Sequence, residues 1–326
     1  HSLKAWGYRV GNYKEAFDTD WKTFSPAMLD YCVQDVEVTH SLFTMIHNRG
    51  YSEQAMDLEH EVATLIYIQE KHGFTFHKEK AEALYSKLNA RRMELEEELS
   101  KIFLPITTKR VSEKTGKQLK DKVTVFNPSS RLHIADRLKE KYNWQPEEFT
   151  PEGKPKLDDS VLSQLEYPEA KILCEHFLLD KRIAQLATGN QAWLKVERNG
   201  KIHGVCNTNS TVTARATHSS PNLAQIPSVS VPFGKECREL FTVPKGKKLV
   251  GIDISGLEVR MLAHFMSKYD DGEYTKVVLD GDIHTETQKL AGLESRDLAK
   301  RFYYAFLYGS GVKKIALITG KKVSEA

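Results

Sequence analysis

The last quarter of the chain places the strongest constraint on the fold, because an apolar run there ends in an acidic residue and precedes a helix with regularly spaced cations. Residues 248–253 are compact and apolar, which predicts a buried central strand that ends at Asp253. The chain then turns at Ser255-Gly256 into an expected amphipathic helix. A carboxylate at the edge of a sheet can bind Mg²⁺ together with substrate phosphates. The alternative is an aspartate that only marks the entry to the helix.

Three side chains on a helix expected from residue 296 onward share one face. Arg296, Lys300 and Tyr304 recur at intervals of four residues, which places them about one turn apart. A guanidinium can bind phosphate oxygens in bidentate fashion, and an ammonium provides a compact charge. The face therefore matches a polyphosphate followed by a sugar and a base. A solvated basic face with a core at Phe302 and Phe306 would have the same spacing.

Two further side chains have two interpretations each. Glu258 stands three residues after Ser255, which is the spacing of a capping box, but it could also contact a ribose hydroxyl beside the metal. His284, in Gly281-Asp-Ile-His-Thr, could be a neutral hydrogen-bond partner in the core or a ligand for phosphate. Neither spacing decides between the two roles.

Helical patterns account for most of the first 190 residues. Ser25-Pro26 is a cap residue followed by proline, and apolar positions continue the pattern to about Arg49. Two long helices at residues 55–72 and 78–103 are joined by Gly73-Phe-Thr-Phe, which predicts a helical hairpin. Further helices are expected after the turn at 126–130 and at 160–165 and 169–186, with a surface loop at 146–156.

The sequence changes character near residue 191, where strand patterns begin. Asn199-Gly200 lies between residues 193–198 and 201–205 and predicts a β-hairpin. Proline-bounded loops beyond it carry Arg215 and Gln225. Either side chain could hydrogen-bond the minor-groove acceptors that every base pair shares, or could serve only the architecture of the loop.

The overall composition is that of a globular protein. The 326 residues are enough for two or three domains, with 40% hydrophobic and 28% charged residues. No apolar run approaches the length of a membrane span, and the four cysteines make no Cys-x-x-Cys pair. We therefore expect a soluble protein with free thiols in a reducing cytoplasm.

A basic surface, if present, must be local, because the net charge of +3 is too small to imply nucleic acid by itself. Residues 107–123 hold six cations and two acidic residues, Glu113 and Asp121. This basic segment has no apolar periodicity, so we expect a loop that is either solvated or in contact with backbone phosphates. The cations are Lys109, Arg110, Lys114, Lys117, Lys120 and Lys122.

Taken together, these motifs resemble those of family A DNA polymerases, the DNA polymerase I type, and most closely those of the replicative polymerases of short-tailed phages. The resemblance covers nearly the whole chain. The similar segments are residues 31–35 (third exonuclease motif), 126–130 and 181–183 (thumb and template contacts), 213–215 with 221–227 (primer-template motif), 253–260 (motif A) and 296–309 (motif B on the fingers helix).

The resemblance implies a helix-rich α+β chain, part of a right-hand polymerase fold joined to the helical tail of a ribonuclease-H-like 3′-5′ exonuclease domain. The implied domains are residues 1–52 (exonuclease), 53–190 (thumb), 191–266 (first part of the palm) and 267–326 (fingers). The implied activity is DNA-directed DNA synthesis in viral replication, by two-metal phosphoryl transfer. The implied partners are primer-template DNA and deoxynucleoside triphosphates.

The resemblance also implies a role for each matching residue. At the polymerase site these are Asp253 and the carbonyl of Ile254 (both Mg²⁺ ions), Glu258 (sugar selection), His284, Arg296 and Lys300 (triphosphate), Tyr304 (nucleotide sugar) and Tyr308 (template base). Elsewhere they are Arg215 and Gln225 (primer-end minor groove), Lys181 (DNA backbone) and Tyr31 and Asp35 (exonuclease site, with Asp35 as a metal ligand).

Departures from the family pattern limit these expectations. Asp253 needs a second carboxylate from a His-Asp-Glu motif, and neither this motif nor the first exonuclease motifs occur in the 326 residues. We therefore expect an internal fragment that is inactive alone. Ala214 stands where the family commonly has glycine. The segment between Phe103 and Phe126 is short, so no processivity factor is expected to dock there.

Two other functions are compatible with the same residues. One is a non-catalytic protein that binds primer-template DNA on the same scaffold. The other is a nucleotidyltransferase that uses ribonucleotides, but Glu258 argues for deoxynucleotides.

Overall fold

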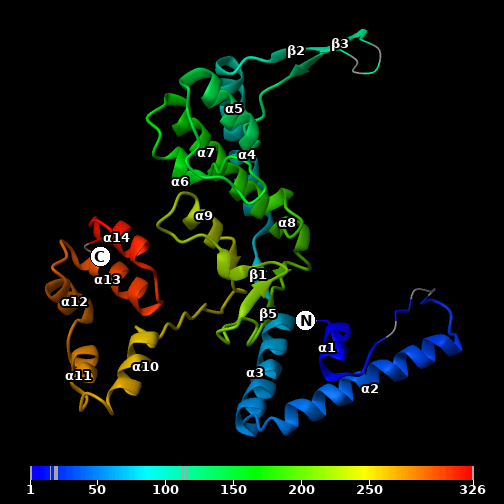
Figure 1. Ribbon diagram of the computed structural model, residues 1–326, viewed down its shortest axis with the longest axis vertical. Coiled ribbons are helices and arrows are strands. Elements are labelled where there is room, and N and C mark those ends of the chain that lie inside the picture. The colour runs from blue at the N-terminus through cyan, green and yellow to red at the C-terminus, as the bar shows by residue number, and fades with distance from the viewer. Residues whose placement is uncertain (1, 15, 18–20, 112–113, 115, 325–326) are drawn as a thin grey trace. The chain divides into compact units, whose positions relative to one another are not determined.

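The structure is a computed structural model that describes residues 2–14, 16–17, 21–111, 114 and 116–324. The chain forms two compact units, which we call unit 1 (residues 1–248) and unit 2 (residues 249–326). Both units are mostly helical, and the described strands all belong to unit 1 (Figure 1).

Local capping residues mark where the long helices of unit 1 begin and end. The hydroxyl of Ser25 accepts a hydrogen bond from the Met28 backbone N–H at 3.2 Å, and Pro26 is the first residue of its helix. Gly73, with a φ of 63°, ends the next helix. The helices of unit 1 are α1 (Leu3–Val10), α2 (Pro26–Asn48), α3 (Glu53–His72), α4 (Lys78–Ile102), α5 (Arg131–Tyr142), α6 (Asp159–Leu162), α7 (Pro168–Ile183), α8 (Trp193–Val196) and α9 (Gly234–Arg238), with the π-helical turn η1 (Ala184–Thr188) and the 3₁₀ turn η2 (Leu223–Gln225).

Two apolar clusters along α4 form the core of unit 1. Helix α4 packs against α7, and Leu88 and Leu95 of α4 are buried together with Leu179 of α7. The second cluster surrounds the last turn of α4 and consists of Leu99, Phe103, Phe126, Ile134, Ala135, Leu138, Trp144, Leu157, Leu162 and Leu173. The apolar positions predicted on α4 are therefore core positions, and their partner is α7.

A three-stranded antiparallel sheet lies where the sequence predicted a helical hairpin, so that prediction is wrong. Strand β1 (Phe74–Phe76) follows α3 and pairs with β4 (Lys201–Ile202) on one side and β7 (Phe241–Thr242) on the other. The Phe-Thr-Phe segment consists of aromatic and β-branched residues, which favour a strand once partner strands flank it. Helix α4 begins after this strand and packs against α7, whereas the prediction paired it with α3.

The β-hairpin predicted at residues 193–205 is correct at its turn and wrong in its first strand. Asn199 and Gly200 have φ values of 53° and 74°, as a type I′ turn requires. The preceding residues form the short helix α8 instead. The Trp193 ring is 3% exposed and packs edge-on against Phe241, with ring centroids 5.2 Å apart. Burial of this large ring outweighs the strand propensity of the segment.

The basic segment is a β-hairpin rather than the expected loop (Figure 1). Its strands β2 (Ile106–Val111) and β3 (Gln118–Thr124) pair with each other, as do β5 (Val205–Asn207) and β6 (Thr217–Ser219) in a separate sheet. The register of β2 and β3 shifts between Thr108 and Arg110. Both strands are exposed along almost their whole length, so they have no buried apolar face that would have indicated a strand in the sequence. Glu113 lies outside the described residues.

Unit 2 contains helices α10 (Leu257–Met266), α11 (Glu273–Asp280), α12 (Ile283–Ala291), α13 (Arg296–Leu307) and α14 (Val312–Thr319). Helix α10 packs against α11, and α13 packs against both α12 and α14. Ala299 and Ala305 of α13 are buried. The small side chains of this helix therefore face its neighbours.

The buried strand predicted at residues 248–253 is wrong. These residues are irregular, no described strand pairs with them, and the Ile252 side chain is 90% exposed. An apolar run forms a central strand only where its backbone N–H and C=O groups find partners on both sides. The described part of the chain supplies no such partner strand.

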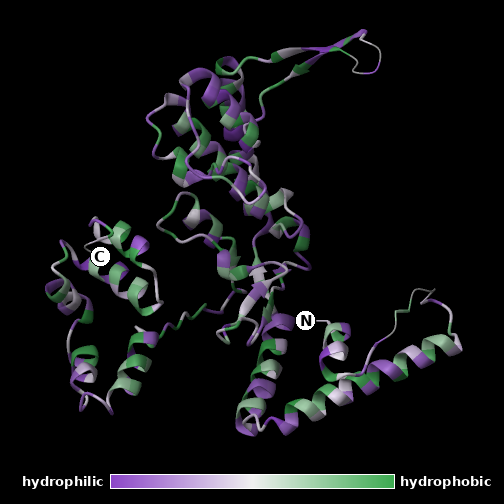
Figure 2. Cartoon of the chain, viewed as in Figure 1, coloured by the Kyte–Doolittle hydropathy of each residue, from purple (hydrophilic) through white to green (hydrophobic). Residues whose placement is uncertain are grey.

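Apolar residues occur along α2 and α3, although few of them are buried (Figure 2). Val38 is the buried residue of α2, and α3 has none among the described residues. Phe43 of α2 and Leu65 of α3 are 66% and 65% exposed. In the described ranges no helix combines the length and apolar character needed to cross a membrane.

Candidate functional site

Unit 2 brings several of the predicted triphosphate-binding residues to one pocket. Helix α13 begins at Arg296 because the Ser295 hydroxyl accepts a hydrogen bond from the Leu298 backbone N–H at 3.2 Å. Arg296, Lys300 and Tyr304 then follow one another along one face. The pocket has a volume of about 280 Å³ and is lined by Ser255, Gly256, Val259, Arg260, Val278, Gly281, Asp282, Ile283, His284, Arg296, Lys300 and Tyr304.

Arg296 is paired with a carboxylate that the sequence analysis did not single out. Its Nε donates to Asp282 Oδ2 at 2.6 Å, and its Nη2 donates to Asp282 Oδ1 at 3.1 Å. The hydrogen bonds from Arg296 hold the pKa of Asp282 well below its usual range, and Asp282 in turn raises the pKa of Arg296. The two side chains are 52% and 40% exposed, so solvent reaches the pair.

The surroundings of His284 in this pocket favour its neutral form. Burial lowers the pKa of His284 below its usual value of 6.5, and the positive charge of Arg296 lowers it further. Its ring lies 5.9 Å from the ring of Tyr304, centroid to centroid. Its Nδ1 is buried and has no hydrogen-bond partner in the described part of the chain. Both interpretations from the sequence remain predictions, because a neutral imidazole can also donate to a phosphate.

Glu258 does not form the capping box that was one of its two interpretations from the sequence. Helix α10 begins after Gly256, whose φ is 59°, and no side chain caps it. Because Gly256 rather than Ser255 occupies the cap position, the reciprocal spacing of a capping box is lost. The Glu258 carboxylate instead accepts a hydrogen bond from the Tyr308 hydroxyl at 2.7 Å. This bond links the start of α10 to the end of α13.

Asp253 and Ile254 lie in the irregular segment before α10, and the pocket lining does not include them. Both are exposed. The described residues contain no group of three or more His, Cys, Asp or Glu side chains that could hold a metal ion. Asp253 is therefore a single candidate carboxylate, beside the single candidate carbonyl of Ile254.

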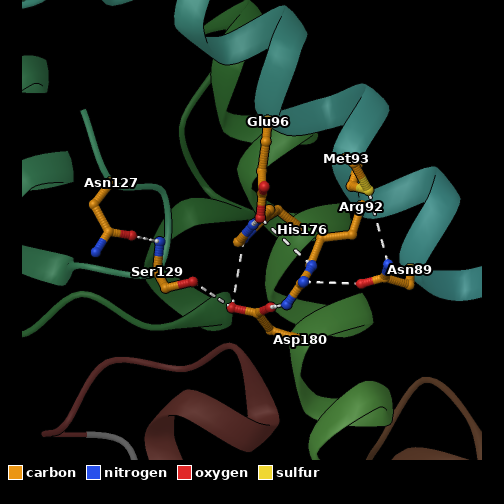
Figure 3. Close-up of polar contacts among 8 residues, drawn as sticks. All are labelled: Asn89, Arg92, Met93, Glu96, Asn127, Ser129, His176 and Asp180. Carbon is orange, nitrogen blue, oxygen red and sulfur yellow. Dashed lines mark hydrogen bonds and ion pairs between the residues drawn. The ribbon is translucent and has the colours of Figure 1, made fainter. Parts of the chain in front are cut away.

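In unit 1, Lys181 lies on α7 beside a second cavity of about 770 Å³. A polar network supports this face of α7 (Figure 3): the Asp180 carboxylate accepts hydrogen bonds from Ser129 Oγ at 2.5 Å and from Arg92 Nη1 at 3.1 Å. The buried His176 places its Nδ1 3.8 Å from the same carboxylate. The network joins α4, α7 and the loop before α5. The cavity is lined by Ser129, Arg131, Asp158, Asp159, Ser160, Phe177, Asp180 and Lys181.

Arg215 and Gln225 lie on separate irregular segments of unit 1. The Arg215 backbone N–H donates to the Thr211 hydroxyl at 2.9 Å, in a turn where Ala214 has a φ of 58°. Such a φ favours glycine, which gives a physical reason for the glycine expected at this place in the motif. Gln225 ends η2, and its backbone carbonyl accepts a hydrogen bond from the Gln185 side chain at 3.3 Å.

Tyr31 and Asp35 lie on α2, one turn apart, and share a cation that the sequence analysis missed. Lys14 Nζ lies 2.5 Å from Asp35 Oδ1 and 4.4 Å from the centroid of the Tyr31 ring. The hydrogen bond to Asp35 raises the pKa of Lys14. No local pattern indicated Lys14, because the contact joins separate segments of the chain.

Comparison with known proteins gives the family. Residues 94–326 match the model of DNA polymerase family A. Over 98% of its length the chain is 37% identical to the DNA-directed DNA polymerases of Escherichia phage T7 and Enterobacteria phage T3. The match covers 60% of each relative, so the chain spans less than two thirds of their length.

A solved structure shares the fold. The POL domain of Pol1 from M. smegmatis, in complex with DNA primer-template and dNTP, has a TM-score of 0.65 over 99% of this chain and 54% of its own chain, at 18% identity. The helix-rich α+β fold predicted from the sequence is thereby confirmed. By its sequence over residues 94–326 and by its phage relatives, the chain belongs to DNA polymerase family A.

Proposed function

We propose that the chain forms the nucleotide- and primer-template-binding part of a DNA-directed DNA polymerase that adds deoxynucleotides to a primer 3′ end. The observation that carries this proposal is the pocket of unit 2, where three cations (Arg260, Arg296 and Lys300), a carboxylate, an imidazole and a phenol line one cavity. Such a set suits a triphosphate joined to a sugar. Family membership and the phage relatives, which are named DNA-directed DNA polymerases, support the same reaction.

In this proposal the residues along α13 bind successive parts of the incoming nucleotide. Arg296 and Lys300 contact the phosphates, because a guanidinium and an ammonium bind phosphate oxygens through charge-assisted hydrogen bonds. His284 donates a further hydrogen bond as a neutral imidazole. Tyr304, one turn beyond Lys300, packs against the sugar. Positioning and electrostatic stabilisation are the main contributions that a protein makes to phosphoryl transfer.

The bond between Glu258 and Tyr308 is part of the same proposal. Glu258 selects a deoxyribose because its carboxylate, held by the Tyr308 hydroxyl at 2.7 Å, leaves little space for a 2′-hydroxyl. Tyr308 packs against the template base through the face of its ring. The role of Glu258 is tested by measuring ribonucleotide discrimination in a Glu258→Ala variant.

Family A polymerases generally use divalent metal ions, and we propose Mg²⁺ for this protein. Asp253 and the Ile254 carbonyl offer the hard oxygen ligands that Mg²⁺ prefers, and Mg²⁺ commonly binds one or two carboxylates plus substrate phosphates. When bound, two ions would activate the primer hydroxyl and stabilise the leaving pyrophosphate. The donor set in the described residues is partial, because it includes one carboxylate.

We further propose that primer-template DNA contacts unit 1. Lys181 at the 770 Å³ cavity binds the backbone, and Arg215 and Gln225 donate to minor-groove acceptors that all base pairs share. The domain limits at residues 52, 190 and 266 are part of this proposal. In the intact protein, Tyr31 and Asp35 would belong to a 3′-5′ exonuclease site, with Asp35 as a metal ligand. No processivity factor is proposed for the short hairpin of β2 and β3.

Primer extension by the product of the complete gene tests the proposal. We expect template-directed addition of deoxynucleotides, with a KM for the nucleotide that rises at least about tenfold in an Arg296→Ala variant. The matched control is Lys289→Ala, an exposed cation on α12 that is paired with Glu286 and lies outside the pocket lining. Absence of template-directed addition, or equal effects of the two substitutions, would contradict the proposal.

A further inference from the structure

Asp282 is a carboxylate in the nucleotide pocket to which the proposed function gives no role. It accepts two hydrogen bonds from the Arg296 guanidinium, at 2.6 and 3.1 Å. It also caps α12, where it accepts hydrogen bonds from the His284 backbone N–H at 3.1 Å and from the Thr285 hydroxyl at 2.8 Å. One side chain therefore ties the first residue of α13 to the first turn of α12.

The geometry of this pair leaves one edge of the guanidinium open. A guanidinium is planar and carries five N–H donors in a fixed fork. Asp282 occupies the edge formed by Nε and Nη2. In the described part of the chain, Nη1 of Arg296 makes no hydrogen bond or ion pair. Because the group is rigid, holding one edge sets the direction of the other edge, which can bind phosphate oxygens.

We propose that Asp282 is a positioning residue, which orients Arg296 so that its open edge faces the triphosphate of the incoming nucleotide. This inference rests on the proposed role of Arg296 in nucleotide binding. Arginine is long and flexible, and ordering it before the ligand arrives lowers the entropy lost on binding.

An opposing effect exists, because the negative charge of Asp282 repels phosphates. The carboxylate already neutralises one cation of the pocket. The Asp282 and Arg296 side chains are 40% and 52% exposed, however, and water screens charges at such sites. Orientation of the guanidinium is not screened in this way. We therefore expect that removing Asp282 weakens nucleotide binding.

Substitutions at Asp282 can separate orientation from helix capping. Asp282→Ser keeps a good cap for α12 but is too short to hold both Arg296 donors. Asp282→Ala loses both functions, so the difference between the Ser and Ala variants measures capping. Asp282→Asn keeps the shape and the cap with one uncharged acceptor oxygen, and it serves as a second variant if the Ser variant folds poorly. Circular dichroism checks that each variant is folded.

The measurement is single-nucleotide incorporation by the product of the complete gene, with dATP and Mg²⁺ on a primer-template. We expect the KM for dATP to rise about tenfold in Asp282→Ser and about threefold in Asp282→Asn. The decisive readout is a double-mutant cycle with Arg296→Ala. If Asp282 acts through Arg296, adding Asp282→Ser to Arg296→Ala changes KM by less than about twofold. A purely structural role would reduce activity in both backgrounds.

The outcomes distinguish this inference from the proposed function. An unchanged KM in Asp282→Ser, while Arg296→Ala raises KM, would overturn the positioning role and leave the proposed function standing. Multiplicative effects in the double variant would also overturn it. If Arg296→Ala itself leaves KM unchanged, the nucleotide-binding role of Arg296 fails and the positioning role fails with it.

Discussion

The buried carboxylate of Glu169 provides a direct test of how unit 1 is held together. Glu169 lies in the first turn of α7 and is 3% exposed. Its Oε1 accepts a hydrogen bond from the Lys141 ammonium, and its Oε2 accepts one from the Tyr142 hydroxyl at 2.5 Å. A Lys141→Met substitution removes the cation and keeps an apolar side chain of similar length. The Tyr142 hydroxyl is then the remaining side-chain partner of a buried carboxylate.

The expected loss of stability follows from the burial of Glu169 and the partial exposure of Lys141. Removing one partner of a fully buried ion pair typically costs about 3–5 kcal/mol. The Lys141 side chain is 42% exposed, so water replaces part of the lost interaction. We therefore expect Lys141→Met to lower the free energy of unfolding by about 1–3 kcal/mol at neutral pH. A double substitution, Lys141→Met with Glu169→Met, should cost less than Lys141→Met alone, because no buried charge is left unpaired.

The pH dependence supplies a second, independent check. Burial raises the pKa of Glu169, but the hydrogen bonds from Lys141 and Tyr142 outweigh it and leave the pKa below its ordinary value of 4.5. A group whose pKa is lowered by folding stabilises the protein above its unfolded pKa, and this contribution is lost as the pH falls through the folded pKa. The difference in the free energy of unfolding between wild type and Lys141→Met should therefore become smaller as the pH falls.

Urea unfolding followed by tryptophan fluorescence measures these differences in the free energy of unfolding. Trp144 reports on unfolding because it is buried in the core cluster around the last turn of α4. The matched control is Lys101→Met, since Lys101 is paired with Glu97 on the surface and is 71% exposed. Equal unfolding midpoints for wild type and Lys141→Met would refute the reasoning. A double variant less stable than the Lys141→Met variant would refute it as well.

Three further predictions concern the basic hairpin, the nucleotide pocket and the cysteines. The first is a substitution of four hairpin cations by neutral residues: Lys109, Arg110, Lys120 and Lys122. In a plot of the logarithm of the association constant for duplex DNA against the logarithm of the salt concentration, the slope should become shallower by about 0.9 for each cation that contacts a phosphate. An unchanged slope would mean that the hairpin is solvated. Tyr304→Phe should weaken dideoxynucleotide incorporation relative to deoxynucleotides in primer extension, because the phenol oxygen can replace the missing 3′-hydroxyl as a hydrogen-bond partner; an unchanged ratio would count against this role. Burial raises the pKa of Cys237 to about 11. Iodoacetamide at about pH 8 should therefore modify the exposed Cys32 of the native protein before Cys237. Mass spectrometry of the modified protein measures the order, and faster modification of Cys237 would contradict the prediction.

Local signals predicted the helices well, because residues close in sequence decide where a helix begins. The hydroxyls of Ser25, Ser130 and Ser295 each accept a hydrogen bond from a backbone N–H in the first turn of the following helix. Strands depend on distant partners, which spacing does not reveal. Phe74 pairs with Ile202, and nothing near Phe74 in the sequence indicates that pairing. The same reason explains why the apolar run at 248–253 was wrongly predicted as a strand.

The candidate site shows the same difference between local features, which the sequence predicts, and contacts between distant segments, which it does not. Helical spacing was sufficient to predict that Arg296, Lys300 and Tyr304 share one face, because that arrangement is local. The partners of these residues come from other helices. Asp282 reaches Arg296 from the start of α12, and Tyr308 reaches Glu258 across 50 positions of sequence. A motif therefore predicts which groups meet a ligand, but the groups that hold them in place require the tertiary structure.

The contacts between helices have a chemical consequence for the pocket that we propose to bind the nucleotide. Before any ligand arrives, Arg296 already donates to a carboxylate and Glu258 already accepts from a phenol. A nucleotide must therefore either use the donors that remain or displace the existing partner. The open edge of the guanidinium allows the first course for Arg296. Glu258 Oε1 already accepts the Tyr308 hydroxyl, so a sugar hydroxyl that bonds to that oxygen would have to displace the phenol. The two interactions should consequently respond differently to substitution: loss of Asp282 should affect nucleotide affinity, whereas Tyr308→Phe should change template-dependent selection of the base and sugar.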